Sequence, residues 1–170
     1  MASIIKANQL QDFGGNSILT SDGAGVVTPN ASGIKNTPAF SAKMASGQSI
    51  ANGTHTTLVF GTETYDPDNV FDGTSTFTVP SDGRYYLFGQ SGRQGWGSNR
   101  FLIYFYKNGS TELSAAETIA SGQYQTTATS AVVDLSSGDT VVVRLYQDNG
   151  STQTTSSGDR STFQGYKLIG

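Results

Sequence analysis

The sequence contains no cysteine, and its 170 residues include a single histidine, His55. Without cysteine the chain can form no disulfide bond, no thiolate nucleophile and no cysteine-bound zinc or iron–sulfur site. One imidazole likewise excludes any site that needs two. A fold of this chain must therefore be held together by non-covalent packing.

Charge and long apolar runs are also scarce. Charged residues make up 14% of the chain and the net charge is −3, so the sequence lacks the clustered lysine and arginine that bind phosphate groups. No apolar run approaches the roughly 18 residues that indicate a transmembrane helix, and residues 1–6 lack the basic and apolar regions of a secretory signal. We therefore expect no nucleic acid partner and no membrane insertion.

Small polar residues are abundant, since Gly, Ser and Thr each occur 21 times. Such a composition is typical of turn-rich β structure. From Pro38 onward, short apolar runs recur between Gly, Asn and Asp residues, which predicts an antiparallel sandwich or barrel. The expected strands are 39–44, 56–63, 75–79, 83–90, 100–107, 124–135, 139–147 and 161–169. Because eight strands fit a jelly roll, we predict an all-β jelly-roll sandwich at residues 38–170.

The local turn chemistry supports this assignment. Asn108-Gly109 lies between two strand-like runs and is among the strongest signals for a tight hairpin. Residues 112–120 are the only segment with helical composition, but they have no capping residues and no sustained 3.6-residue period. We expect them to form a loop or the edge of a sheet.

The strand predicted at 101–106 has two apolar faces. Alternation points its two phenylalanines and Ile103 one way, and Leu102, Tyr104 and Tyr106 the other way. A strand with one face in water would alternate between apolar and polar residues. Two explanations remain open. Either a loop or the second sheet covers the other face, or Tyr104 and Tyr106 pack against another copy of the chain, because tyrosine suits interfaces.

The segment Phe77-Thr78-Val79-Pro80-Ser81-Asp82-Gly83-Arg84-Tyr85-Tyr86-Leu87-Phe88 resembles the central motif of the complement-type globular head, a member of the tumour-necrosis-factor-like jelly-roll superfamily. Similar stretches follow the family order at 38–42, 70–73, 107–109, 135–141 and 161–168. The resemblance implies a jelly roll that trimerises about a three-fold axis, with one sheet of each protomer facing the axis. The sequence has no collagen-like Gly-X-Y stalk, so we do not expect a humoral or cytokine role.

The first 37 residues read as a separate segment, the N-terminal arm. Residues 3–12 and 15–23 resemble leader segments of tail-fibre and virion structural proteins of tailed bacteriophages. Turn signals such as Gly14-Gly15 separate short β-prone pieces, so we expect an extended N-terminal arm without a core of its own. The candidates for attachment to another protein are its apolar residues Ile4, Ile5, Leu10, Ile18 and Leu19.

Residues that catalysis requires are sparse. His55 lies in a turn that enters a strand, where we expect an exposed imidazole without a partner. No nucleophile-elbow pattern is present, and the 13 acidic residues single out no pair at glycosidase spacing. We predict that the chain is not an enzyme and uses no cofactor.

Asp66, Asp68 and Asp72, around Pro67, are the one candidate metal site in the sequence. Hard oxygen ligands crowded in a loop suit calcium. The spacing, however, does not follow the EF-hand pattern, which needs glycine at the sixth place and glutamate at the twelfth. A solvated acidic loop is the alternative explanation, and we favour it over calcium.

Residues 91–100 hold the only tryptophan, Trp96, between Arg93 and Arg100. If the loop is exposed, these residues form an interaction loop that contacts a sugar ring or a protein partner through stacking and cation–π interactions. Alternatively, Trp96 folds back and caps one end of the jelly roll.

Together these features predict a homotrimeric, non-enzymatic structural protein on the virion surface of a bacteriophage, assembled in the host cytoplasm. Three heads would bury apolar sheet faces around an axis, and the arm would bind the major capsid protein or another virion protein. We favour capsid decoration or stabilisation. A tail-fibre tip or receptor-binding protein that recognises a host surface glycan or protein is the alternative.

Overall fold

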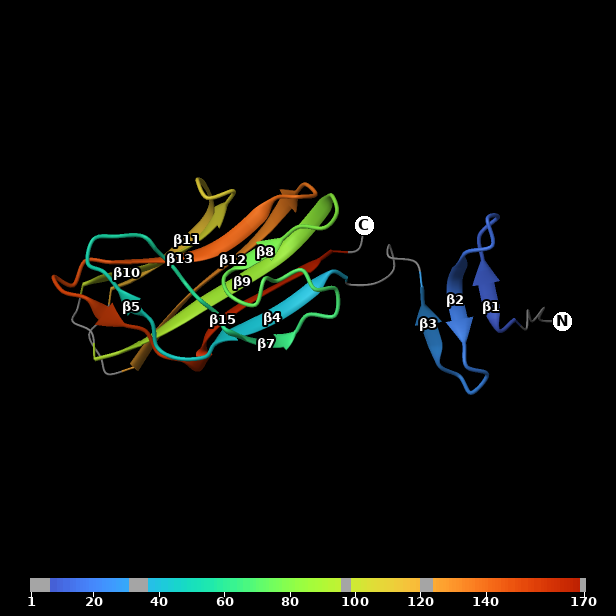
Figure 1. Ribbon diagram of the computed structural model, residues 1–170, viewed down its shortest axis with the longest axis horizontal. Coiled ribbons are helices and arrows are strands. Elements are labelled where there is room, and N and C mark those ends of the chain that lie inside the picture. The colour runs from blue at the N-terminus through green and yellow to red at the C-terminus, as the bar shows by residue number, and fades with distance from the viewer. Residues whose placement is uncertain (1–6, 31–36, 96–98, 120–123, 169–170) are drawn as a thin grey trace. The chain divides into compact units, whose positions relative to one another are not determined.

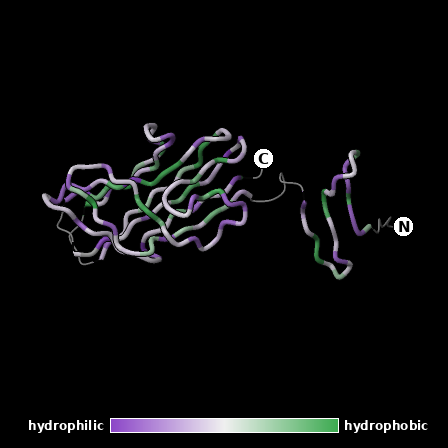
Figure 2. Tube along the Cα trace, in the orientation of Figure 1, coloured by the Kyte–Doolittle hydropathy of each residue, from purple (hydrophilic) through white to green (hydrophobic). Residues whose placement is uncertain are grey.

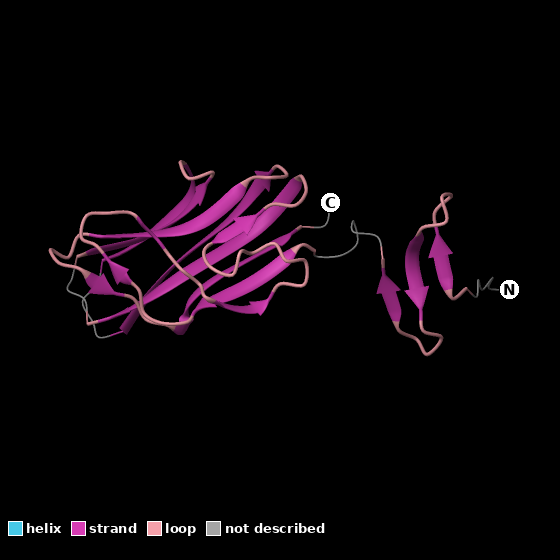
Figure 3. Cartoon of the chain, in the orientation of Figure 1, coloured by secondary structure: helices cyan, strands magenta, loops and turns pink. Residues whose placement is uncertain are grey.

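The computed structural model describes residues 7–30, 37–95, 99–119 and 124–168, which form strands joined by turns and loops (Figure 3). None of the described segments is a helix that could span a membrane. The chain divides into two compact units. The larger is Pro38–Leu168, called the head below, and the smaller contains the N-terminal strands.

The head is a sandwich of two antiparallel sheets (Figure 1). The β9 sheet has the strand order β12-β9-β15-β4-β7, and the β10 sheet has the order β11-β10-β13-β6, with β8 also paired to β13. The strands of the β9 sheet are β12 (Tyr124–Leu135), β9 (Gly83–Gln94), β15 (Gly158–Lys167), β4 (Ala39–Met44) and β7 (Thr62–Tyr65). Those of the β10 sheet are β11 (Thr111–Ile119), β10 (Arg100–Lys107), β13 (Thr140–Gln147), β6 (Thr56–Thr57) and β8 (Thr76–Thr78). A short pair of strands, β14 (Gln153–Thr154) and β5 (Ser49–Ile50), completes the head. The predicted all-β jelly-roll sandwich is therefore confirmed.

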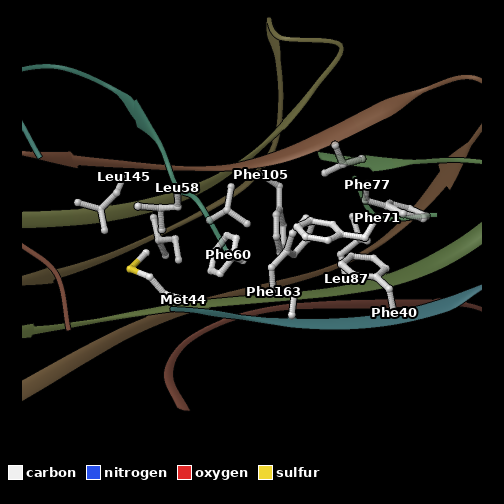
Figure 4. Packing of buried hydrophobic residues seen from close by; sticks show 14 of the residues in the cluster. Phe40, Met44, Leu58, Phe60, Phe71, Phe77, Leu87, Phe105, Leu145 and Phe163 are labelled. Carbon is white, nitrogen blue, oxygen red and sulfur yellow. The ribbon is translucent and has the colours of Figure 1, made fainter. Parts of the chain in front are cut away.

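The core lies between the two sheets and is rich in phenylalanine (Figure 4). Phe163 on β15 is fully buried, and its ring centre lies 4.8 Å from that of Phe40, 5.8 Å from that of Phe60 and 5.8 Å from that of Phe105 on β10. Strand alternation produces this inner face, since every second residue of β13 is also buried. Full burial of a phenylalanine side chain stabilises a fold by about 1.5–3 kcal/mol, so this cluster joins the two sheets.

One strand prediction differs from the structure, and for a second segment the structure selects one of the two predicted alternatives. The strand expected at 56–63 is divided into β6 of the β10 sheet and β7 of the β9 sheet, because Leu58 and Phe60 between them are buried in the core. The segment expected to be a loop or a sheet edge forms β11, the edge strand of the β10 sheet. Asn108-Gly109 joins it to β10 with positive φ at both residues, 50° and 74°, which confirms the predicted tight hairpin.

The N-terminal unit contains a three-stranded antiparallel sheet, called the arm sheet, made of β1 (Gln9–Gln11), β2 (Ser17–Ser21) and β3 (Val27–Pro29). Hydrophobic segments occur in the strands of both units (Figure 2). Nevertheless, none of residues 7–30 is buried. The described part of the arm is therefore folded into short strands rather than extended, and it has no core of its own.

We expect Phe163→Ala to lower the free energy of unfolding of the head by about 3–5 kcal/mol, because the substitution leaves a cavity where a central ring was. The measurement is urea unfolding followed by circular dichroism. Phe13→Ala is the matched control, since Phe13 lies in the arm and is fully exposed. Equal losses in the two variants would contradict the central place of Phe163 in the core.

Candidate interaction surfaces

The outer face of the β9 sheet carries apolar side chains that the protomer leaves uncovered. Because Tyr85 and Leu87 point into the core, Tyr86 between them points outward. Strand pairing places Val132 of β12, Tyr86 of β9 and Tyr166 of β15 side by side in one row, called the open face. The ring centres of Tyr86 and Tyr166 lie 5.3 Å apart, and Val132 and Tyr166 are 58% and 36% exposed.

Charged pairs flank the open face. Arg84 lies two residues before Tyr86 on β9, and its paired residue Asp134 lies two residues after Val132 on β12. Arg84 Nε donates to Asp134 Oδ1 at 2.9 Å. This hydrogen bond holds the pKa of the Asp134 carboxyl below its usual range. On the other side, Lys43 Nζ lies 3.3 Å from Asp159 Oδ1. An apolar centre with a charged, solvated rim is the usual anatomy of a protein–protein interface.

The outer face of the β10 sheet carries Tyr104 and Tyr106, the trimer contacts that the sequence suggested, but the same protomer already covers much of it. Tyr104 is only 9% exposed, and its ring centre lies 4.9 Å from that of His55 and 5.9 Å from that of Tyr106. Burial raises the pKa of the Tyr104 hydroxyl. For Tyr104, the structure therefore supports the explanation in which another segment of the same chain covers the strand.

The expectation of an unpartnered imidazole at His55 is wrong. The side chain is exposed, but its ring contacts those of Tyr104, Tyr106 and Tyr146, at centre distances of 4.9, 6.0 and 5.2 Å. Pairing of β6 with β13 holds the segment that carries His55 beside these strands. A turn residue thus acquires aromatic partners that lie far away in the sequence.

Arg93 is not on a loop, which corrects the prediction of an interaction loop at 91–100. Strand β9 continues to Gln94, and alternation points Arg93 inward, where it is 2% exposed. Its guanidinium donates to the side-chain oxygen of Gln125 and lies 4.9 Å from the ring centre of Phe101. Burial lowers the pKa of Arg93.

The other two residues of that predicted loop have separate outcomes. Arg100 begins β10 and is exposed, and its Nε donates to Glu117 Oε1 at 2.8 Å. Trp96 lies outside the described residues. The structure therefore does not bring the three predicted contacts together on one described surface.

An open groove of about 600 Å³ lies at the end of the head where β9 and β14 end and β12 begins. Tyr124 and Arg160 line it, with the guanidinium of Arg160 4.7 Å from the ring centre of Tyr124. The remaining lining residues are Gly47, Gly95, Thr154, Thr155, Ser156 and Ser157. Sequence reasoning missed this groove because its residues come from four separate segments.

The aspartates of the candidate calcium loop bind backbone amides of their own loop. Asp66 accepts hydrogen bonds from the amides of Val70 and Phe71, at 3.0 and 2.8 Å. Asp72 Oδ1 accepts from three successive amides, residues 74 to 76, at 2.7–3.0 Å. Within the described ranges, no three His, Asp or Glu side chains, Asp68 included, lie close enough together to hold a metal ion.

The arm sheet exposes more apolar surface than the sequence indicated. Leu10 is 53% exposed, whereas Ile18 and Leu19 are half-buried. Ile4 and Ile5 lie outside the described residues. Three apolar residues absent from the predicted set, Phe13, Val26 and Val27, are also exposed. Phe13 precedes Gly14-Gly15 in a turn, a position where an apolar side chain has no core to pack against. The Gly14-Gly15 turn signal was therefore the feature of the sequence that could have identified Phe13 as exposed.

The family model of the C1q domain matches residues 39–168, and the chain belongs to this family. Among solved structures, the globular domain of zebrafish complement 1qA is similar with a TM-score of 0.60 and 18% identity, covering 78% of this chain and 98% of that one. Murine APRIL matches with a TM-score of 0.59 and 16% identity (76% and 98% covered), and Eiger TNF from S. frugiperda with 0.58 and 11% (76% and 91%). No curated protein sequence matches the chain. The predicted resemblance to complement-type and TNF-like jelly rolls is thereby confirmed.

The hydrogen bonds of Asp72 predict a pH dependence. Burial alone would raise the pKa of Asp72, but the donors at residues 74 to 76 lower it to about 2, from 3.8. A carboxyl with a lowered pKa in the folded state stabilises the fold above its unfolded pKa, and this contribution is lost as the pH falls towards about 2. We expect the free energy of unfolding to fall between about pH 4.5 and 2.5, and to fall less in Asp72→Asn. Urea unfolding at several pH values measures this, and parallel curves for the two proteins would contradict it.

Proposed function

We propose that this chain is a non-enzymatic structural protein of a bacteriophage particle, in which residues 38–170 form a trimeric head and residues 1–37 form an attachment arm. The open face is the observation that carries the proposal. Domains of the C1q and TNF type form homotrimers, and this head presents Tyr86, Val132 and Tyr166 in one uncovered apolar row.

The open face suits self-association better than the face that carries Tyr104. Tyrosine and valine offer large apolar area, and fixed strand positions reduce the entropy lost on binding. On the β10 sheet His55 and its neighbours already cover Tyr104, so a partner there would gain little further burial. We therefore assign the trimer interface to the β9 sheet.

The arm supports attachment to a particle. Its sequence resembles phage leader segments, and Phe13 and Val26 are exposed although they are apolar. Residues 7–30 fold into short strands joined by turns, and the sequence contains no long repeat that would form a fibre shaft. These features favour decoration of a shell over a place at the tip of a fibre.

Receptor binding is the second candidate, and the groove beside Tyr124 is the observation that favours it. A tyrosine ring stacked with Arg160 and surrounded by hydroxyl groups offers the apolar face and the hydrogen-bonding groups that a sugar needs. In this function the head would bind a glycan or protein on the host surface, and the arm would hold it on the tail.

The trimer interface is tested by Val132→Asp, which places three carboxylates in an apolar contact. We expect the wild-type chain to have three times its mass of 17.9 kDa, about 54 kDa, and the variant to be a monomer at micromolar concentration. Light scattering gives the masses. Val59→Asp is the matched control, because Val59 is 44% exposed and lies outside the open face.

Two results would overturn this assignment. A monomeric wild-type chain would remove the trimer altogether. Dissociation by Tyr106→Ser together with an intact Val132→Asp trimer would return the interface to the β10 sheet.

The particle role is tested with virions that lack this protein. A protein that binds only the assembled shell stabilises it by about 2.7 kcal/mol per site at a hundredfold excess over the dissociation constant. We expect the depleted virions to lose DNA at a lower temperature but to adsorb to host cells normally. Added full-length protein should restore heat resistance, whereas protein that lacks residues 1–37 should not. Normal heat resistance with lost adsorption would favour receptor binding instead.

A further inference from the structure

The two faces of the arm sheet differ in polarity: one carries most of its apolar strand residues, and the other, called the polar face, carries polar residues with Ile18 of β2 among them. Strand pairing places Leu10, Leu19 and Pro29 in one row across the three strands. Val27 lies two residues before Pro29 and so faces the same way; these four residues are called the apolar arm face. The next row, Gln9, Thr20 and Thr28, is polar and points to the opposite side.

The apolar arm face needs a cover. Leu10 is 53% exposed and Val27 56%, and none of residues 7–30 is buried. A sheet of three strands becomes stable when its hydrophobic face packs against something. A shallow hollow of about 150 Å³, lined in part by Leu10, Leu19 and Val27, lies on this sheet and can receive an apolar side chain.

The distribution of charge in the arm favours the arms of other protomers as the partner that covers this face. Residues 7–30 contain two charged side chains, Asp12 and Asp22, and both lie in turns. Asp12 accepts from the amide of Asn16 at 2.9 Å, and Asp22 accepts from the amide of Ala24 at 2.7 Å. The apolar arm face itself is uncharged. At a symmetry axis each residue meets its own copies, which repel one another if charged but not if apolar.

The short length of chain between the arm sheet and the head also favours the arms of other protomers as the partner. Seven residue steps join Asn30 to Thr37, so the chain between the arm sheet and the head spans at most about 25 Å. A trimeric head would therefore hold three arm sheets near one another, at an effective concentration of about millimolar. For each arm, the nearest matching apolar surfaces then belong to the two other arms.

We propose that the apolar arm faces of three protomers pack against one another around the three-fold axis and form a second core of the trimer. This inference rests on the trimeric head of the proposed function. It leaves Phe13 and the edge strands β1 and β3 on the outside, where they can bind the particle.

Single cysteines test the packing in the full-length chain, which has no cysteine of its own. Under mild oxidation with diamide we expect Leu19→Cys to form a covalent dimer that contains up to about two thirds of the chains, since two of three axial thiols can pair. Thr20→Cys, one residue away on the polar face, is the matched control and should remain uncrosslinked. Denaturing electrophoresis without reductant reads both results.

Light scattering on the same samples separates the possible failures. A trimer in which Leu19→Cys does not crosslink, or in which Thr20→Cys crosslinks equally, would overturn the arm packing and leave the proposed function standing. A monomer would overturn the trimer of the proposed function and this inference with it.

A second pair of variants tests the packing without oxidation. Leu19→Asp would place three carboxylates at the axis, and we expect proteases to cleave the arm roughly tenfold faster while the head remains a trimer. Thr20→Asp should be cleaved at the wild-type rate. Equal cleavage of both variants would contradict the packed arm.

Discussion

The head depends on one contact across the sandwich, the packing of Phe163 of β15 against Phe105 of β10 on the other sheet. Space for this packing exists because Gly89 of β9 and Gly165 of β15 carry no side chain. A Cβ atom at Gly89 would lie 3.0 Å from Phe105, and one at Gly165 would lie 2.9 Å from Phe40. A larger residue at either position would therefore displace Phe105 or Phe40, and a slip of one residue in β9 or β15 would turn the inner face outward.

The same register determines what the head presents to a partner. With Leu87 turned inward, Tyr86 stands outward and meets Val132 and Tyr166 of the neighbouring strands. On the β10 sheet, alternation also turns Tyr104 outward, but His55 of the same protomer packs against its ring. The two outer faces of the sandwich are therefore unequal, and the proposed trimer uses the face that the protomer leaves uncovered.

Local signals made part of this predictable. The apolar run at 101–106 and the Asn-Gly turn that follows determine strand and hairpin through neighbouring residues alone, so both were predicted correctly. Arg93 was misplaced because the partners of its buried guanidinium, among them Gln125 and Phe101, come from other strands and are not evident in the local sequence. The open face was missed for a related reason: its residues are adjacent only after β9, β12 and β15 have paired.

In the proposed trimer the arm depends on the head more than the head depends on the arm. The head has its own phenylalanine core, whereas the arm sheet has strands of three to five residues and none of residues 7–30 is buried. Under the proposed arm packing, folding of the arm sheet would therefore be coupled to assembly of the heads, because three apolar arm faces must meet before any of them is covered. Since a monomer cannot keep its arm sheet covered, only a complete trimer would present an ordered arm to a particle.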